Sequence, residues 1–253
     1  MILNAVEAGT GEPLVLLHGL FGSAQNFGAA QRRLAERFRV LALDLRNHGA
    51  SPHDPDMSYD AMARDVVETL AARGALPAAI MGHSMGGKVA MSVALRQPQA
   101  LSRLIVSDIA PVAYPPAFRT YAAAMQAIPL APGLTRAQAD AALADVVPEP
   151  AIRAFLLQNL RPGSSPEWRI GLAEIGAALP VIEGWDAPPG ATYDGPTLFI
   201  SGARSDYIRM EHRPAIRALF PAARFVSVKD AGHWVHAENP DGFLAVLVGF
   251  LRS

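Results

Sequence analysis

The stretch that decides the fold is residues 80–87, which read Ile-Met-Gly-His-Ser-Met-Gly-Gly. Before it, Ala78–Met81 is a short apolar run typical of a buried strand, and after it Met85–Arg96 carries apolar residues at helical spacing. A serine flanked by glycines two positions away on each side, at a strand-to-helix junction, matches the G-x-S-x-G turn that exposes a nucleophilic hydroxyl. Glycines are needed because β-carbons this close to a sharp bend would collide. The stretch therefore predicts Ser84 as a nucleophile.

On both sides of this turn, short apolar runs alternate with helical patterns. The predicted strands are Leu14–Leu17, Arg39–Leu43, Ala78–Met81, Arg103–Ser107, Thr197–Ser201 and Arg224–Val228. The predicted helices are Ala24–Phe38, Ser58–Arg73, Met85–Arg96, Glu211–Leu219 and Pro240–Leu251. This alternation predicts an α/β fold with a mostly parallel, twisted sheet and helices on both faces.

The alternation breaks once, between residues 111 and 190. Twelve of the 21 prolines fall in this interval, and its helical patterns are short. We therefore expect a core domain formed by residues 1–110 and 191–253, and a small helical cap or lid formed by residues 111–190. Ligands bind such sheets outside the carboxyl ends of the strands, so the cap is expected to cover the site.

Composition excludes several classes of function. With 253 residues, 51% of them hydrophobic, the chain has enough apolar material for one principal domain. Its 22 basic and 23 acidic residues nearly cancel, so neither nucleic acid nor an anionic membrane is an expected partner. The absence of cysteine excludes disulfides, thiolate zinc sites and a cysteine nucleophile. Met1–Pro13 lacks a signal-peptide pattern and no apolar run reaches about eighteen residues, so we expect a cytoplasmic protein without a membrane span.

A serine hydrolase needs two N–H donors for the oxyanion that forms during attack. The Met85 N–H, at the start of a predicted helix, is expected to supply the first. The second is expected from residues 17–22, Leu-His-Gly-Leu-Phe-Gly, which leave an earlier strand. We assign it to the Leu20 N–H, with Phe21 as the alternative.

The serine also needs a base, and histidine titrates in the suitable range. Of seven histidines, His233 follows the last predicted strand by a short loop and comes last in the order nucleophile, acid, base. His236 is the rival. His18 and His83 flank the glycine turns and are expected to serve loop hydrogen bonding, and no histidine and carboxylate set has the spacing of a metal site.

Two aspartates qualify as the acid that orients the base. Asp108 ends the strand Arg103–Ser107, and Asp206 lies beyond the strand Thr197–Ser201. The usual position is the fourth of a Gly-x-x-Asp sequence after that later strand, but here the position holds Ser205, and Asp206 is one residue late. The residues alone therefore leave both aspartates as candidates, to fix the imidazole tautomer and stabilise its protonated form.

Five segments together resemble the α/β-hydrolase superfamily, and most closely its YbfF-type esterase and thioesterase branch. They are Leu14–Gly22, Leu43–Gly49, Gly82–Gly87, Ser107–Pro111 and Ala231–Pro240. The resemblance implies that the acid follows the strand before the cap, which maps onto Asp108, and that a serine assists it, which maps onto Ser205. It also implies that Asp44, Arg46 and His48 brace the loop beside the site.

The predicted reaction is attack of Ser84 on the carbonyl of a small acyl ester or thioester, followed by release of the acyl group by water. No cofactor is required. Tyr207, Trp168 and Trp234 are expected to contact the substrate together with Ser205, and Phe21, Tyr114 and Trp185 are further aromatics near the expected mouth. The alternatives are a cofactor-free perhydrolase or C–C hydrolase or lyase of the same fold, and a small-molecule receptor that retains the triad.

Overall fold

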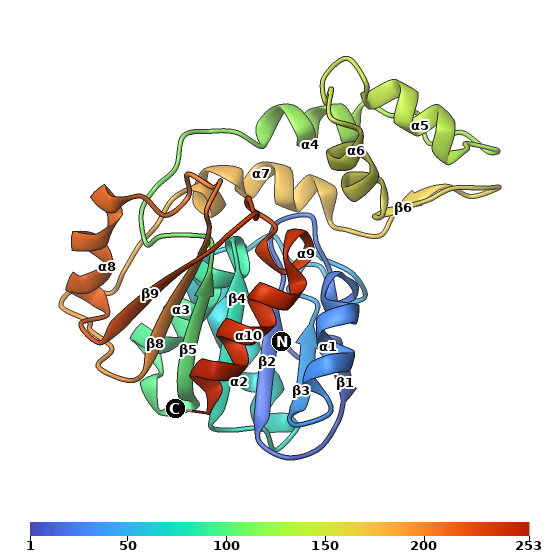
Figure 1. Cartoon of the computed structure of the whole chain (residues 1–253). Coiled ribbons are helices and arrows are strands. Elements are labelled where there is room, and N and C mark those ends of the chain that lie inside the picture. The colour runs from blue at the N-terminus through green and yellow to red at the C-terminus, as the bar shows by residue number, and fades with distance from the viewer. Residues whose placement is uncertain (253) are drawn as a thin grey trace.

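The computed structural model describes residues 1–252 and arranges them around a seven-stranded sheet (Figure 1). The strands follow the order β1-β3-β2-β4-β5-β8-β9. β1 pairs antiparallel with β3, and the other neighbours pair in parallel. The bounds are Ala5–Ala8 for β1, Pro13–Leu17 for β2, Arg39–Leu43 for β3, Ala78–His83 for β4, Leu101–Ser107 for β5, Thr197–Gly202 for β8 and Ala223–Val228 for β9. The predicted mostly parallel sheet is confirmed.

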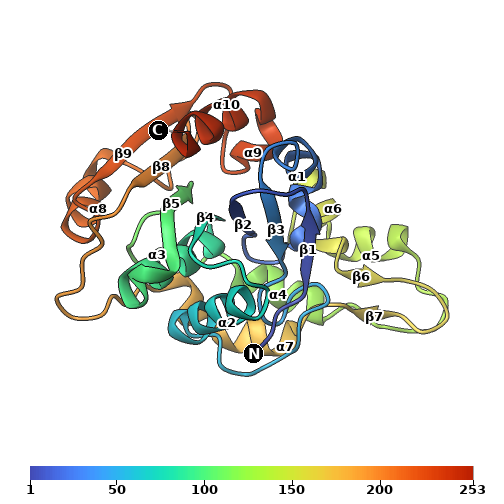
Figure 2. The ribbon, with the colours of Figure 1, turned by 90° about the horizontal axis from the view of Figure 1, so that it is seen from below.

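Helices cover both faces of this sheet, as Figure 2 shows from below. One face carries α2 (Tyr59–Ala72), α3 (Met85–Arg96) and α8 (Arg213–Leu219). The opposite face carries α1 (Gly28–Leu34), α9 (Val235–Glu238) and α10 (Pro240–Leu251). Short 3₁₀ turns lie at Ala24–Phe27, Pro98–Ala100 and Met210–His212.

The strands divide their side chains between two apolar clusters. In β4, Ile80 packs into the cluster beneath α2 and α3, whereas Met81 packs into the cluster beneath α1 and α10. Leu104 and Ile105 of β5 divide in the same way. Alternate side chains of a strand point to opposite faces, and both faces are covered here. The predicted strands are therefore apolar at nearly every position.

Residues 111–190, called the cap segment below, lie between β5 and β8. They form α4 (Arg119–Gln126), α5 (Arg136–Leu143), α6 (Pro150–Leu157), α7 (Leu172–Glu183) and the hairpin of β6 (Leu160–Arg161) and β7 (Glu167–Trp168). Figure 1 shows these elements above the sheet, on the side where the parallel strands end. The segment is thus in position to cover groups at the carboxyl ends of the strands.

Three local features differ from the sequence expectation. The edge strand β1 and the two-residue strands β6 and β7 were not predicted. The helix expected over Ala24–Phe38 is a 3₁₀ turn followed by the shorter α1, which ends at Leu34.

In residues 1–252, none of the helices combines the length and the apolar composition needed to cross a bilayer.

Candidate active site

Ser84 sits at the bend between β4 and α3 with φ of 52° and ψ of −120°. A positive φ is costly for a residue with a β-carbon, so the surrounding structure has to impose it. The flanking glycines make the bend possible: a β-carbon on Gly82 would lie 2.1 Å from the Gly86 carbonyl oxygen, and one on Gly86 would lie 2.4 Å from the Leu17 carbonyl oxygen. The Ser84 side chain makes no capping hydrogen bond to its own helix. Its hydroxyl is therefore held at the sheet edge without a local partner.

His233 Nδ1 donates a hydrogen bond of 2.7 Å to Asp108 Oδ2. Asp108 follows β5 and is fully buried. Its carboxylate also accepts hydrogen bonds from the Ser205 hydroxyl, after β8, and from the Gly202 N–H at 3.1 Å. Three neighbouring strands, β5, β8 and β9, thus deliver the acid, its supporting donors and the imidazole to one point. This arrangement fixes the proton of neutral His233 on Nδ1 and leaves Nε2 as the acceptor.

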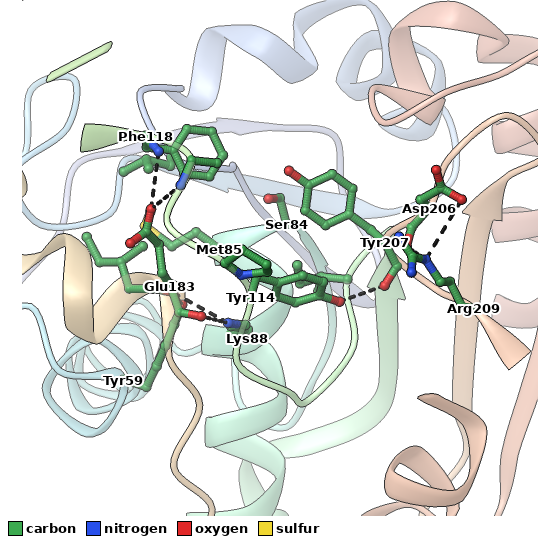
Figure 3. A pocket seen from close by; sticks show the side chains of 15 residues that line it. Tyr59, Ser84, Met85, Lys88, Tyr114, Phe118, Glu183, Asp206, Tyr207 and Arg209 are labelled. Carbon is green, nitrogen blue, oxygen red and sulfur yellow. Dashed lines mark hydrogen bonds and ion pairs between the residues drawn. The ribbon is translucent and has the colours of Figure 1, made fainter. Parts of the chain in front are cut away.

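Asp206, the other candidate acid, points away from this group. Its side chain is 88% exposed, and its nearest cationic partner is Arg209 at 3.9 Å. Figure 3 shows Asp206 and Arg209 together, on the far side of Tyr207 from Ser84. The one-residue offset that separates Asp206 from the usual position thus turns its carboxylate outward, and Ser205 points inward instead.

Ser84 and His233 line the same cavity, of about 570 Å³. Ser84 also lines a second, smaller cavity of about 290 Å³. The Tyr207 ring stacks on the His233 ring at 4.1 Å between centroids and 26° between planes. The His83 Nε2–H donates to the His233 carbonyl oxygen at 2.8 Å. The imidazole is therefore held from its backbone, its face and its Nδ1 edge.

The backbone N–H groups of Met85 and Leu20 lie near Ser84 and have no protein acceptor within residues 1–252. Both residues line the smaller cavity beside Ser84. The Phe21 N–H, by contrast, donates to His48 Nε2 at 3.2 Å. Of the two loop donors considered from the sequence, Leu20 is therefore the one whose N–H is available to an oxyanion.

Two buried histidines hold the loop that carries Leu20. His48 Nδ1 donates to the Arg46 carbonyl oxygen at 2.9 Å, so its Nε2 is the acceptor for the loop. His18 Nδ1 donates to the Gly19 carbonyl oxygen at 2.8 Å, and its Nε2 accepts from the Leu45 N–H at 3.0 Å. Burial lowers the pKa of both rings, that of His48 to about 3. Both histidines are thus neutral and serve loop hydrogen bonding.

Asp44 and Arg46 stabilise the neighbouring segment. Asp44 accepts hydrogen bonds from the N–H groups of Ala24 and Ala50 at 2.7 and 2.9 Å. Arg46 Nε donates to Asp65 at 2.7 Å, and both side chains are buried. These contacts tie the segment after β3 to η1 (Ala24–Phe27) and to α2. They match the bracing role that the resemblance implied for Asp44, Arg46 and His48.

Comparison with known proteins identifies the family. The family model described as alpha/beta hydrolase fold matches residues 12–240. The chain belongs to the α/β-hydrolase family. It is 40% identical over 242 residues to the esterase YbfF of Escherichia coli, covering 95% of this chain and 93% of the relative. It is 42% identical over 247 residues to the mouse protein named sn-1-specific diacylglycerol lipase ABHD11, covering 94% and 80%. A solved marine microorganism esterase superposes with a TM-score of 0.95 at 34% identity, covering 98% and 99%.

His236, the rival base, has no carboxylate within ion-pair distance among the described residues. Its ring packs on Phe27 at 4.9 Å and on His83 at 4.9 Å between centroids. Burial and the nearby His233 lower the pKa of His236 to about 4. Its Nδ1 is buried and unpartnered among the described residues. A ring in this position packs in the core and lacks the orienting carboxylate that His233 has.

The aromatic side chains expected near the substrate are divided among several places. Tyr207 and Trp234 line the larger cavity, and Tyr207 lines the smaller one too. Trp168 does not line either cavity: it belongs to β7 and lines a separate hollow beside Asp44. Trp185 packs against the Tyr59 ring instead. The expectation for Trp168 is not met because this residue lies in the hairpin of β6 and β7, which the sequence did not predict.

Sequence reasoning missed two buried charged residues of this α/β hydrolase, Lys88 and Glu183. Both line the smaller cavity, and Figure 3 shows them on the side opposite Asp206. Lys88 follows Ser84 by one helical turn, so its position on the apolar face of the Met85–Arg96 pattern was a usable signal. Nothing in the sequence connects Glu183, at the end of α7, with that helix.

Proposed function

We propose that this ester hydrolase cleaves small or medium acyl esters or thioesters through an acyl-enzyme intermediate on Ser84. In this proposal His233 is the general base, Asp108 is the acid that orients it, and Leu20 and Met85 supply the oxyanion donors. The observation that carries the proposal is the 2.7 Å hydrogen bond between His233 and Asp108, made beside a cavity that Ser84 also lines. The esterase and lipase names of the relatives support the same class of reaction.

In the acylation step, the Ser84 hydroxyl attacks the substrate carbonyl carbon while His233 Nε2 takes its proton. The imidazolium that forms carries its Nδ1–H toward Asp108, whose negative charge stabilises it. Ser205 and the Gly202 N–H keep the carboxylate in place by their hydrogen bonds. The negative charge that develops on the carbonyl oxygen is stabilised by the Leu20 and Met85 N–H groups.

The proton then passes from His233 Nε2 to the oxygen or sulfur of the leaving group, and the bond from the carbonyl carbon to that atom breaks. A water molecule, activated by the same nitrogen, attacks the acyl-enzyme and releases the acid and free Ser84. Each proton that His233 accepts is returned within the same half-reaction. The cycle therefore consumes one water and uses only side chains and backbone groups of this chain.

The two cavities beside Ser84 suggest where each half of the substrate lies. His233 has to protonate the leaving group, and it lines the larger cavity. Met85, an oxyanion donor, lines the smaller cavity together with Ile109 and Ile182. We therefore assign the leaving group to the larger cavity and the acyl chain to the smaller one, called the acyl cavity below. Phe118 of the cap segment lines both, which supports a covering role for that segment.

The test is a turnover screen with the purified chain across three substrate classes: p-nitrophenyl esters from acetyl to palmitoyl, acyl-CoA thioesters of the same chain lengths, and lactones. The Ser84→Ala variant provides the background rate. We expect multiple turnovers on esters or thioesters and a preference for short or medium acyl chains. Rates equal to the Ser84→Ala background on every member of the screen would contradict the proposal.

A further inference from the structure

Lys88 is a buried cation that the proposed mechanism does not use. It lies on α3, one turn beyond Ser84, with 2% of its surface exposed. Its Nζ donates to the carbonyl oxygens of Gly184 at 2.6 Å, Glu183 at 3.2 Å and Ile182 at 3.4 Å. Across residues 1–252, no carboxylate lies within ion-pair distance of this ammonium group.

The surroundings of Lys88 show why a charge is tolerated at this place. Its three acceptors lie at the C-terminal end of α7, where unpaired carbonyls carry partial negative charge. The Nζ also lies 5.0 Å from the Tyr114 ring centre and 5.7 Å from that of Tyr59, in the range of cation–π attraction. Burial nevertheless lowers the pKa of Lys88 to about 7. The three carbonyl acceptors match the three N–H donors of the protonated Lys88 amine. These hydrogen bonds connect α3 to the end of α7.

The end of α7 that Lys88 holds is also the point where the two connections of the cap segment meet. The Glu183 carboxylate accepts hydrogen bonds from the N–H groups of Ala117 and Phe118 at 2.8 and 3.2 Å. The Tyr114 N–H donates to the Glu183 carbonyl oxygen at 2.9 Å. The incoming connection, residues 111–118, is thus bound to the outgoing one through Glu183. Lys88 joins both to the helix that begins at the nucleophile.

The same residues form one wall of the acyl cavity. Figure 3 shows Lys88, Glu183 and Tyr59 along one side of it, with Ser84 and Tyr207 on the other. Phe118 and Ile182 line the cavity as well. A shift of α7 relative to α3 would therefore change the space available to an acyl chain, while Ser84, Asp108 and His233 remain held by the segments that follow the core strands.

We propose that Lys88 is a positioning residue that fixes both connections of the cap segment against the nucleophile helix and thereby determines acyl-chain selectivity. The inference rests on the proposed function, since it takes the smaller cavity as the acyl cavity. Lys88 acts through the position of Ile182, Glu183 and Phe118, without contacting the reacting atoms.

The experiment compares the acyl-chain profile of wild type with that of Lys88→Met, which keeps a long apolar side chain and removes the three donors. We expect the ratio of kcat/KM between the best and the poorest acyl chain to fall by about tenfold, which corresponds to about 1.4 kcal/mol. The change should appear mainly in KM. The rate of Ser84 labelling by a small fluorophosphonate should change by less than about twofold, because a small reagent does not reach the wall of the acyl cavity that Lys88 and Glu183 form.

Two further variants make the result interpretable. Arg96→Met removes a cation from the other end of α3 and should leave the acyl-chain profile unchanged. Tyr59→Phe removes the hydroxyl that donates to the Ile182 carbonyl oxygen, so it should shift the profile in the same direction as Lys88→Met but less. It also serves as the test if Lys88→Met does not fold.

An unchanged acyl-chain profile in Lys88→Met would overturn the inference. If Lys88→Met does not fold, an unchanged profile in Tyr59→Phe would overturn it. An equal loss of kcat/KM for every chain length would overturn it as well. In each case the proposed function would stand, since wild type would still turn over esters. Absence of turnover by wild type would instead remove the proposed function and this inference together.

Discussion

Asp108 reaches His233 because β5, β8 and β9 are neighbours in the sheet. Each of these strands ends at the same edge, and the loop after each one contributes a side chain to the group. Asp206 stands only one position beyond Ser205, yet it is exposed. A loop side chain that is moved by one residue can point in the opposite direction, which sequence position alone does not reveal.

Replacing Asp108 by asparagine should lower kcat by about 10⁴-fold, because an amide at this place favours the wrong imidazole tautomer. Replacing Asp206 by asparagine should change kcat by less than about twofold, since its carboxylate is exposed and paired only with Arg209 at 3.9 Å. The measurement is steady-state hydrolysis of p-nitrophenyl acetate by both variants, with circular dichroism to verify folding. If kcat fell by orders of magnitude in Asp206→Asn and stayed near the wild-type value in Asp108→Asn, the assignment of the acid would be reversed.

Ser205→Ala should have a smaller effect than Asp108→Asn. It removes one donor to Asp108, while the Gly202 N–H at 3.1 Å remains. A single hydrogen bond to a charged group contributes about 1.5 kcal/mol, so we expect roughly a tenfold loss of kcat. Ser205→Thr, which keeps the hydroxyl, is the matched control and should retain more activity than Ser205→Ala. Equal kcat for Ser205→Ala and wild type would show that this donor does not support the acid.

The sequence was informative about residues whose role depends on a local motif. Ser84 could be predicted because the glycines and the strand-to-helix junction are contiguous in the chain. The sequence favoured Leu20 over Phe21 but could not give the reason, a hydrogen bond from the Phe21 N–H to His48, which is distant in sequence. The Lys88 contacts with the end of α7 depend on the packing of the cap segment, for which the sequence offered no template.

At the scale of elements, the bend that carries Ser84 between β4 and α3 packs tightly against the end of β2. This contact determines whether the Ser84 hydroxyl is held at the sheet edge. Gly86→Ala would place a β-carbon 2.4 Å from the Leu17 carbonyl oxygen, and because the nearest atoms are all backbone of Leu17 and His18, no side chain can move aside to make room. We expect loss of esterase activity and a free energy of unfolding lower by about 2 kcal/mol or more. The measurement is urea unfolding together with hydrolysis of p-nitrophenyl acetate.

Gly249→Ala is the matched control for Gly86→Ala. Gly249 is an exposed position of α10, and a β-carbon there would have no neighbour within 4 Å. Alanine is the better helix former, so this variant should be more stable by about 0.5–1 kcal/mol and fully active. A comparable loss of activity in both variants would show that the bend at Ser84 is no more sensitive to an added β-carbon than the exposed face of α10.

The elements that the sequence predicted well are those with strong apolar patterns. The strand Arg39–Leu43 has the same bounds in the structure, and Met85–Arg96 is α3. β1 was missed because its four residues, Ala5–Ala8, lie at an edge and none of them is buried, so they carry no apolar pattern. β6 and β7 have two residues each, which is too short for any periodicity. Trp168 lies in this unpredicted hairpin and therefore outside both cavities beside Ser84.

For the whole molecule, buried histidines predict instability in acid. Burial lowers the pKa of His48 to about 3 and that of His236 to about 4, whereas both titrate near 6.5 in the unfolded chain. Between these values the unfolded state binds more protons than the folded state, so stability falls as the pH falls. We expect the free energy of unfolding, measured with urea, to drop by at least about 2 kcal/mol from about pH 7 to about pH 4.5.

His236→Phe tests whether these rings are responsible. The ring packs among aromatic neighbours, including Phe27 and Phe243, so phenylalanine should be accommodated. The loss of stability between neutral and acidic pH should be smaller in this variant than in wild type, because one group that takes up a proton on unfolding is gone. An identical pH dependence in both proteins would exclude His236 as a contributor.

The central claim is that one hydroxyl, at the bend between β4 and α3, forms a covalent bond with the acyl group. The most direct measurement is mass spectrometry of the protein after reaction with a fluorophosphonate, with the modified peptide sequenced. The account predicts one adduct per chain on Ser84, none on Ser84→Ala, and much slower labelling of Asp108→Asn. An adduct on another residue, or a Ser84→Ala variant that is labelled and turns over esters like wild type, would contradict it.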